Sequence, residues 1–481
     1  MPKLTMPNTP IKIESPTSDF IDHLNSNNRI LFSGAFGIGK TFFLEHFFEI
    51  QEIKDKYNVF HLFPINYQIA SNEDIFELIK YDILTHLFNF DWVKINSEQF
   101  SKLLVAQSFL LNNGVNIASK IMKCIPVIDK VGKAIETFTN IHKDFVKYKN
   151  CVNENDNRLI TEFFAHFEQK KGSIYEFDVI SEFISDKLAN CNSGIEEDKQ
   201  RENVLVIDDL DRIDPEHIFR LLNVFSAHTD RGDGTNKFGY DKIIFVCDVQ
   251  NIRNIFAAKY GQHTDFSGYI DKFYSTEIFY FNNKIAIFEY IREIMYRHID
   301  IAKNHNNGFL YYEIESIRDI LVMFIDGGVI NLRQLISNVT DLKDKRQSTG
   351  IIKYYYYCGY SIILTCLKIL GGQKDVLLNA VKNASLPMDY EYHNIHIDQI
   401  ITLLLPISID DFLTKAKNNE SCVFRKNDIN IEFKLKMEHS DNARFGSIYA
   451  ETVSTFSNDF NTLQTIFIEA INILDSKGLL K

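Results

Sequence analysis

Eight consecutive residues near the start of the chain combine the residue types that bind phosphate. They read glycine, four further residues, glycine, lysine and threonine, and they follow the short apolar run 29–33 and open a helical pattern. Such glycines allow a tight loop whose backbone N–H groups point inward, and the start of the helix adds a partial positive charge. Lys40 would reach the β- and γ-phosphates of a nucleotide, and the Thr41 hydroxyl would bind Mg²⁺. The expected nucleotide-binding residues are Gly34, Ala35, Phe36, Gly37, Ile38, Gly39, Lys40 and Thr41.

A pair of carboxylates farther along the chain supplies the second half of such a site. The apolar residues 204–207 lead directly into Asp208 and Asp209. A buried strand would deliver Asp208 to the carboxyl edge of a sheet, where it can bind Mg²⁺ through water. Asp209 would polarise or orient the water that attacks the γ-phosphate. The alternative is a solvated strand end, but downstream of a phosphate loop the pair predicts phosphoryl transfer.

The elements that must position these residues alternate between strands and helices. Apolar runs predict strands, and helical patterns separate them. This alternation predicts an α/β fold with a doubly wound parallel sheet that is covered on both faces. The expected strands are 29–33, 58–65, 204–207, 242–247 and 275–281.

The rest of the chain is mainly helical by its pattern. A long helical stretch separates the second and third strands, and helices dominate again from residue 282 to about 372. Within that second stretch, the segment 354–367, which includes four consecutive tyrosines, is 14 residues long, a length typical of a buried core helix. Residues 422–437 alternate like a hairpin around 426–428, and a helix closes the chain.

The phosphate loop, the long helical insertion and the segment 204–212 together resemble the KAP family of P-loop NTPases, relatives of the signalling NTPases grouped near the AAA+ proteins. The resemblance runs from about residue 17 to residue 345, and the sequence DDLDR at 208–212 is its most specific part. It implies ATP and Mg²⁺ as cofactors. It also implies a homo-oligomer or a partner protein, and an output in bacterial defence against phage.

Two further stretches carry residues that the resemblance assigns. The strand 243–247 resembles the fourth core strand of the family, and Asp248 follows it at the position where related enzymes keep a polar residue that senses the γ-phosphate. Residues 331–335 resemble the start of a lid helix whose arginine, here Arg333, can face the nucleotide. Leu332 stands where the family usually has proline, which leaves that helix start less rigid. Arg333 is therefore either a sensor of the nucleotide in the same chain or a structural arginine.

The remaining cationic candidates are harder to assign. Arg253 and Lys272 lie at the far end of the nucleotide-binding region, and either would serve as an arginine-finger-like group for a neighbouring subunit. Arg212 is expected to pair with a nearby carboxylate and to hold the loop after the strand. Spacing along the sequence does not choose among the origins of a finger.

The composition limits which classes of protein remain. The 481 residues are 45% hydrophobic and carry a formal net charge of −12, which excludes a collagen-like or low-complexity chain. This acidity argues against a protein that binds nucleic acid with its whole surface. The stretch 120–149 differs, because it contains seven lysines against three acidic residues. It is either a solvated helix face or a patch that binds nucleic acid, anionic lipid or an acidic partner. Seven singly scattered cysteines favour a reducing cytoplasm over a disulfide framework or a zinc site.

Membrane attachment and guanine specificity find no support in the sequence. Many family members carry two membrane spans in the insertion, but the longest charge-free apolar stretch, 103–119, contains six polar side chains. No transmembrane span is therefore expected. No N-K-x-D element occurs, so ATP is the expected nucleotide.

These patterns together predict four regions and one function. The regions are a lead-in at 1–28, a P-loop NTPase core at 29–281 with a helical insertion at about 90–200, a helical lid at 282–372, and a small α+β region of unknown role at 373–481. The predicted function is a Mg²⁺-dependent ATPase that uses the nucleotide to switch conformation or assembly. The alternatives are a nucleotide-dependent scaffold without hydrolysis and a DNA-associated motor.

Overall fold

The computed structural model of the chain divides into two compact units. The N-terminal unit comprises residues 16–35 and 40–282, and the C-terminal unit comprises residues 1–15, 36–39 and 283–481. The structure describes residues 14–67, 75–110, 132–151, 178–226, 238–298, 308–340, 355–386, 395–407, 412–438 and 446–480.

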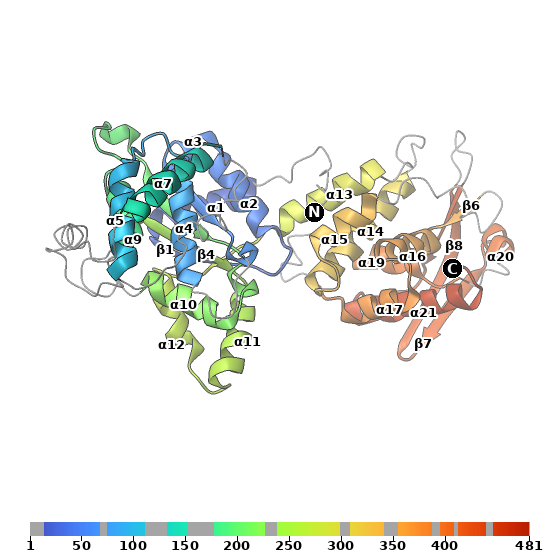
Figure 1. The fold of residues 1–481 in the computed structure, drawn as a ribbon. Helices are drawn as coiled ribbons and strands as arrows, with labels where there is room; N and C mark the ends of the chain where they lie inside the picture. The colour runs from blue at the N-terminus through green and yellow to red at the C-terminus, as the bar shows by residue number, and fades with distance from the viewer. Residues whose placement is uncertain are drawn as a thin grey trace. The chain divides into compact units, whose positions relative to one another are not determined.

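A parallel five-stranded sheet forms the centre of the N-terminal unit (Figure 1). Its order is β2-β3-β4-β1-β5, so β4 lies between the strand that precedes the phosphate loop and the strand that precedes the acidic pair. The predicted doubly wound α/β core is confirmed, although the last strand has two residues where seven were expected. The strands are β1 (Arg29–Ser33), β2 (Tyr57–Leu62), β3 (Glu202–Ile207), β4 (Lys242–Cys247) and β5 (Phe279–Tyr280).

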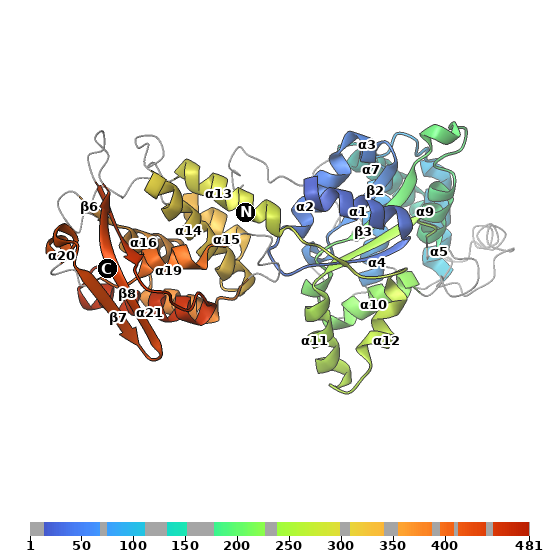
Figure 2. The same cartoon turned by 180° about the vertical axis from the view of Figure 1, so that it is seen from behind.

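Helices cover both faces of this sheet because the strands bury alternate side chains on opposite sides. On one face, α1 (Glu14–Ser26) and α2 (Lys40–Glu49) contribute Phe20 and Phe43, which pack with Phe32 of β1 at ring distances of 5.1–5.9 Å. On the other face, α4 (Ile75–Leu87) and α10 (Pro215–Ser226) pack over β2, β3 and β4 in a second apolar cluster. Figure 2 shows α1 and α2 from behind, on the side of the sheet away from α10.

The described part of the predicted insertion is helical. It contains α5 (Ser97–Leu110), α7 (Gly132–Cys151) and α9 (Val179–Ala189), with α5 packed along α7 and α9 packed on α4. The short elements of the unit are α3 (Gln51–Lys54), η1 (Pro64–Asn66), η3 (Glu197–Lys199), η4 (Leu210–Arg212), α11 (Val249–Tyr260), α12 (Phe266–Ile270) and η6 (Asp271–Phe273).

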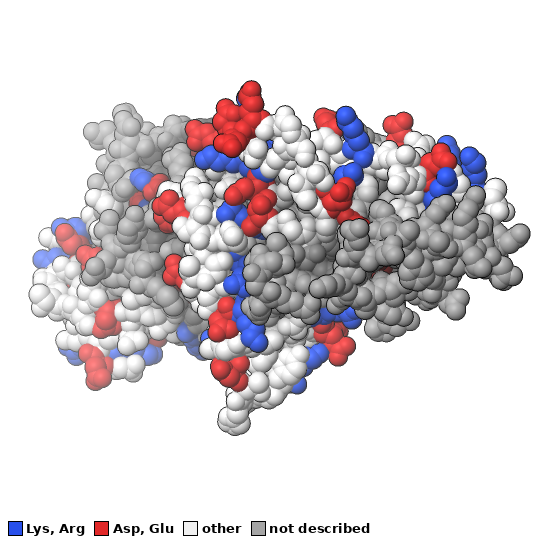
Figure 3. Space-filling model, turned by 90° about the vertical axis from the view of Figure 1, so that its left-hand side faces the viewer, with Lys and Arg blue, Asp and Glu red and all other residues white. Residues whose placement is uncertain are grey.

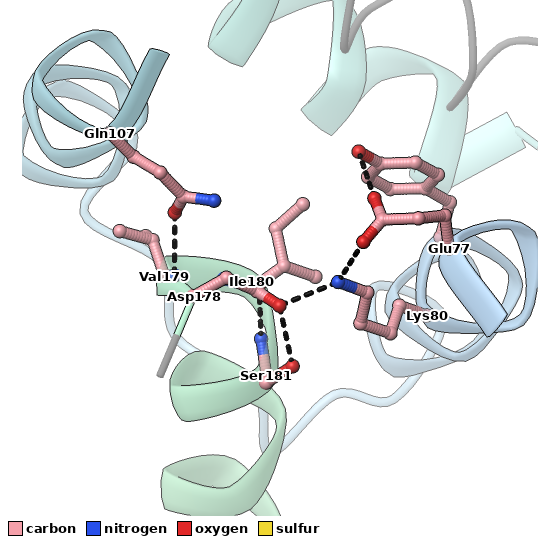
Figure 4. A network of polar contacts seen from close by, with 8 residues as sticks. Glu77, Lys80, Gln107, Asp178, Val179, Ile180 and Ser181 are labelled. Carbon is pink, nitrogen blue, oxygen red and sulfur yellow. Dashed lines mark hydrogen bonds and ion pairs between the residues drawn. The ribbon is translucent and has the colours of Figure 1, made fainter. Parts of the chain in front are cut away.

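A buried ion pair fastens α9 to α4 (Figure 4). Lys80 of α4 lies 2.5 Å from Asp178, the residue that caps the start of α9, and 2.5 Å from Glu77. The Asp178 carboxylate also accepts hydrogen bonds from the backbone N–H groups of Ile180 and Ser181 and from the Ser181 hydroxyl. Although burial acts in the opposite direction, Lys80 and these donors hold the pKa of Asp178 below its usual value.

The C-terminal unit combines helices with a second, four-stranded sheet. The sheet has the order β6-β9-β8-β7, and its β7 and β8 form the antiparallel hairpin that the sequence predicts around 426–428. The strands are β6 (Tyr355–Tyr357), β7 (Ser421–Lys426), β8 (Ile429–Glu438) and β9 (Gly446–Thr452). The helices are α13 (Lys284–His298), α14 (Gly308–Asp326), α15 (Leu332–Thr340), α16 (Cys358–Ile369), α17 (Lys374–Asn383), α19 (Ile397–Leu404), α20 (Phe412–Asn418) and α21 (Phe460–Ser476).

The tyrosine run differs from its prediction. Residues 355–357 form a strand that pairs in parallel with 446–448 of β9, and the helix α16 begins only at Cys358. The prediction of one helix across 354–367 was therefore wrong at its start, because aromatic residues favour strands when a partner is available. This pairing joins residues from both sides of residue 372, where the sequence predicts a boundary between the lid and the C-terminal region. The boundary stays a prediction.

None of the helices in the described ranges is sufficiently long and apolar to cross a bilayer.

Candidate functional site

The phosphate loop connects β1 to α2 through two glycines with positive φ. Gly37 has φ +81° and Gly39 has φ +97°, a region that a side chain would strain. At the base of the loop, the Gly34 N–H donates to the carbonyl oxygen of Cys247 at 3.1 Å, so the loop starts beside the end of β4. The next helix begins at Lys40, as the phosphate-loop pattern requires.

Lys40 folds back over its own loop. Its side chain is buried, and its Nζ donates to the carbonyl oxygens of Gly34 at 2.7 Å and Ala35 at 3.3 Å. A phosphate would offer the same ammonium group stronger, charged acceptors. Thr41 is half-buried directly after it, whereas Phe36 at the loop is 53% exposed.

Asp208 stands at the carboxyl end of β3 and is completely buried. Its Oδ1 accepts a hydrogen bond from the Asp209 backbone N–H at 2.7 Å, and its Oδ2 lies 3.0 Å from Nε2 of His61. Within the described residues, no lysine or arginine forms an ion pair with it. A buried carboxylate with these few partners suits a site that takes up a cation.

Asp209 turns the chain away from the strand. Its backbone is in the left-handed region, with φ 51° and ψ 35°, which aspartate adopts more readily than most residues. Its Oδ2 accepts a hydrogen bond from Nη1 of Arg212 at 2.7 Å, which confirms the predicted pairing of that arginine with a nearby carboxylate. Burial and the neighbouring Asp208 raise the pKa of the Asp209 carboxyl, while Arg212 and Lys40 act against them.

The third carboxylate of this turn is held by the element that follows β4. Asn251 of α11 donates its side-chain amide to Asp211 at 3.1 Å. Asp248, the predicted γ-phosphate sensor, caps the start of α11, and its Oδ1 accepts from the backbone N–H groups of Gln250 and Asn251 at 2.9 and 3.4 Å. In this arrangement Asp248 is engaged as a helix cap.

The end of β4 brings the two predicted motifs into one electrostatic neighbourhood. The buried thiol of Cys247 has its pKa raised well above the usual value, mainly by burial and also by Asp211, Asp248 and Asp208, while Lys40 acts in the opposite direction. Lys40 likewise lowers the pKa of Asp209. Because the loop follows β1 and the acidic pair follows β3, on either side of β4 in the parallel sheet, they share the carboxyl edge, where ligands of open α/β sheets bind.

The candidate arginine and lysine fingers lie in different places. Arg253 is exposed on α11 and stacks over the Phe266 ring at 5.2 Å. Lys272 is exposed in η6, where its carbonyl oxygen accepts a hydrogen bond from Arg29. Arg333 is exposed in the first turn of α15, in the C-terminal unit. Their proposed roles stay predictions.

Two residues of the site were missed by the sequence analysis. His61 contacts Asp208 from the end of β2, and Asn251 contacts Asp211 from α11. A signal for His61 was available, because it lies in the expected strand 58–65, whose end must share an edge with the strand that carries Asp208. Asn251 follows the fourth strand without a recognisable spacing.

Charge on the visible surface of the molecule is mixed. On the face drawn in Figure 3, the described lysine and arginine side chains are interspersed with aspartate and glutamate and form no continuous basic patch. The prediction for the lysine-rich stretch 120–149 lies partly outside the described residues, since 120–131 are not described and the remaining residues belong to α7.

The parallel sheet, the loop after its first strand and the acidic end of β3 define a nucleotide-binding domain of the P-loop NTPase class. A model of the KAP family P-loop domain matches residues 17–343. Because this match covers well over half of the 481 residues, the chain belongs to the KAP family of P-loop NTPases. No curated protein and no solved structure matches it.

Proposed function

We propose that this chain binds ATP with Mg²⁺ and hydrolyses it, and that the nucleotide state switches its conformation or assembly. The observation that carries the proposal is that the phosphate loop after β1 and the acidic pair after β3 flank the end of β4 at the same edge of the parallel sheet. Family membership supports the nucleotide-binding part. The expected link to anti-phage defence and to a partner or second copy rests on the resemblance to bacterial KAP proteins alone.

Each residue has a distinct part in this proposal. Lys40 exchanges its loop carbonyl acceptors for phosphate oxygens, and the inward N–H groups of residues 34–39 hold the phosphates. Thr41 and Asp208 hold Mg²⁺, which neutralises charge on the phosphates when bound. Asp209 orients the attacking water, and its raised pKa makes it a better proton acceptor than an ordinary aspartate.

The proposal is tested by binding and turnover measurements on the full chain. Lys40→Ala removes a charge-assisted contact and should weaken binding of a fluorescent ATP analogue by about 100-fold. Asp209→Asn should bind the analogue like the wild type, but its rate of phosphate release should be lower than that of the wild type by at least about 100-fold. Loss of binding in Asp209→Asn contradicts the role of Asp209, and wild-type protein that binds no nucleotide contradicts the whole proposal.

A scaffold that binds nucleotide without hydrolysing it is the second candidate. The observation that favours it is the 2.7 Å hydrogen bond from Arg212 to Asp209, which occupies the oxygen that would orient water. Equal and negligible phosphate release by the wild type and Asp209→Asn, with intact binding by both, would support the scaffold.

A further inference from the structure

The side chain that touches Asp208 comes from a strand that the motifs of the family do not include. His61 is the penultimate residue of β2, and β2 pairs in parallel with β3 so that Leu62 lies opposite Ile207. One residue farther along, the Asp208 backbone N–H donates to the carbonyl oxygen of Leu62 at 2.9 Å. The two backbones are therefore locked together on both sides of the contact between His61 and Asp208.

The His61 ring is itself held in place. It stacks on the Phe63 ring, with centroids 4.4 Å apart and an interplanar angle of 24°. Its side chain is only 14% exposed. On the side of α4, burial lowers the pKa of the neighbouring His86 imidazole to about 4, so His86 adds no positive charge beside His61 near neutral pH. A ring restrained in this way presents Nε2 in a fixed direction.

The direction matters because an ionised carboxylate only accepts hydrogen bonds. Toward an ionised Asp208, Nε2 of His61 can act only as the donor to Oδ2, while the Asp209 N–H donates to Oδ1. One hydrogen bond to each oxygen fixes the plane of the carboxylate. Since a carboxylate has about four lone-pair sites, two remain for Mg²⁺ or its bound water.

We propose that His61 is a positioning residue for the Mg²⁺ site, which orients the Asp208 carboxylate by a hydrogen bond from Nε2. This inference rests on the proposed function, because it assigns a role toward the metal that Asp208 holds. Partners that orient metal ligands in this way are usually worth 10- to 100-fold in metal affinity.

The test compares two substitutions of His61 in the full chain. His61→Leu keeps an apolar side chain against Phe63 and removes the donor, whereas His61→Gln keeps a donor of similar reach. The dissociation constant of the ATP analogue mant-ATP is measured in excess Mg²⁺ and in EDTA. In His61→Leu the gain in affinity due to Mg²⁺ should fall by about 10-fold or more, and the constant in EDTA should stay at the wild-type value. In His61→Gln most of the gain should return.

The exposed His263, between α11 and α12, provides the matched control, and His263→Leu should behave like the wild type. Circular dichroism and thermal unfolding establish that each variant folds. Two results would overturn the positioning role while leaving the proposed function standing. In the first, His61→Leu keeps the full wild-type gain in mant-ATP affinity due to Mg²⁺. In the second, His61→Leu and His61→Gln lose this gain to the same extent. Wild-type protein that binds no mant-ATP, or binds it equally well in Mg²⁺ and EDTA, would instead overturn the proposed Mg²⁺–nucleotide site, and the inference with it.

Discussion

Two buried carboxylates in the N-terminal unit have opposite surroundings. Asp178, at the start of α9, meets the ammonium of Lys80 and three hydrogen-bond donors of its own first turn (Figure 4). Asp208, at the end of β3, has one histidine and one backbone N–H. The charge of Asp178 is compensated by a lysine inside the protein, whereas the Asp208 carboxylate is held in its orientation without a cationic lysine or arginine.

The difference separates a structural charge from a functional one. A buried ion pair fixes how the helices around it pack, but it has no capacity left for a ligand. A buried carboxylate without a lysine or arginine partner costs free energy in the empty protein and regains it when a cation binds. The contrast between Asp178 and Asp208 therefore makes predictions about stability as well as about binding.

The largest effect on stability is expected at the buried ion pair of Lys80 and Asp178. Lys80→Met leaves Asp178 and Glu77 without their cation and should lower the free energy of unfolding by about 3–5 kcal/mol, measured by urea denaturation. The double variant Lys80→Met/Asp178→Asn removes both charges of the buried pair and should recover a substantial part of that loss. A single variant as stable as the wild type would show that the pair does not fasten α9 to α4.

A third buried carboxylate gives the next largest effect. Burial raises the pKa of Asp82 to about 7, although the Tyr67 hydroxyl donates to it at 2.5 Å. The unfolded chain loses this proton near pH 4 and the folded chain near pH 7, so this group lowers stability progressively as the pH rises through that window. Asp82→Asn should match the wild type at pH 4 and exceed its free energy of unfolding at pH 8 by up to roughly 4 kcal/mol.

Urea denaturation across pH 4–8 measures this difference. Asp198→Asn, which changes an exposed aspartate in η3, serves as the control and should follow the wild-type profile. A constant difference between Asp82→Asn and the wild type at all pH values would contradict the raised pKa.

Asp208→Asn should have a much smaller effect on stability. The amide oxygen can accept from the Asp209 N–H, and the amide nitrogen can donate to His61 if the ring proton moves to its other nitrogen. In EDTA without nucleotide, the free energy of unfolding should therefore fall by no more than about 1 kcal/mol, and removal of the buried charge acts in the stabilising direction. The rise in melting temperature that Mg²⁺–ATP gives the wild type should disappear, and a variant that keeps this rise would rule out Asp208 as the metal ligand.

The smallest effect is expected at the exposed end of the same turn. Arg212 and Asp209 form an ion pair whose side chains are 39% and 23% exposed, so solvent screens much of their attraction. Arg212→Ala should change the free energy of unfolding by about 0–1 kcal/mol, measured by urea denaturation. If Arg212→Ala lowered the free energy of unfolding by several kcal/mol, this ion pair would be a structural contact like that of Lys80 and Asp178.

Local patterns explain what the sequence predicted well. The phosphate loop and the strand before Asp208 are continuous segments whose residue types and spacing carry the information, and the order of strands and helices follows from the same patterns. The sheet of the C-terminal unit was predicted only in its hairpin, because β6 finds its partner far along the chain in β9. A three-residue strand that leads directly into a helix has no periodicity of its own.

Long-range side-chain pairs could not be predicted in the same way. Lys80 and Asp178 are 98 positions apart, and His61 and Asp208 are 147 positions apart. Neither pair has a fixed spacing, and each depends on how two elements pack in three dimensions. Asp208 could thus be predicted from the sequence pattern, whereas its contact with His61 could be found only from the register of β2 against β3.

The left-handed backbone of Asp209 restricts which amino acids this position can accept. With φ at 51°, asparagine and glycine fit without distortion, whereas valine or isoleucine would force the turn to reopen. Natural variation at position 209 should therefore be confined to a narrow set such as aspartate, asparagine and glycine. A mutant library at this codon would recover folded protein from that set and lose it for β-branched replacements.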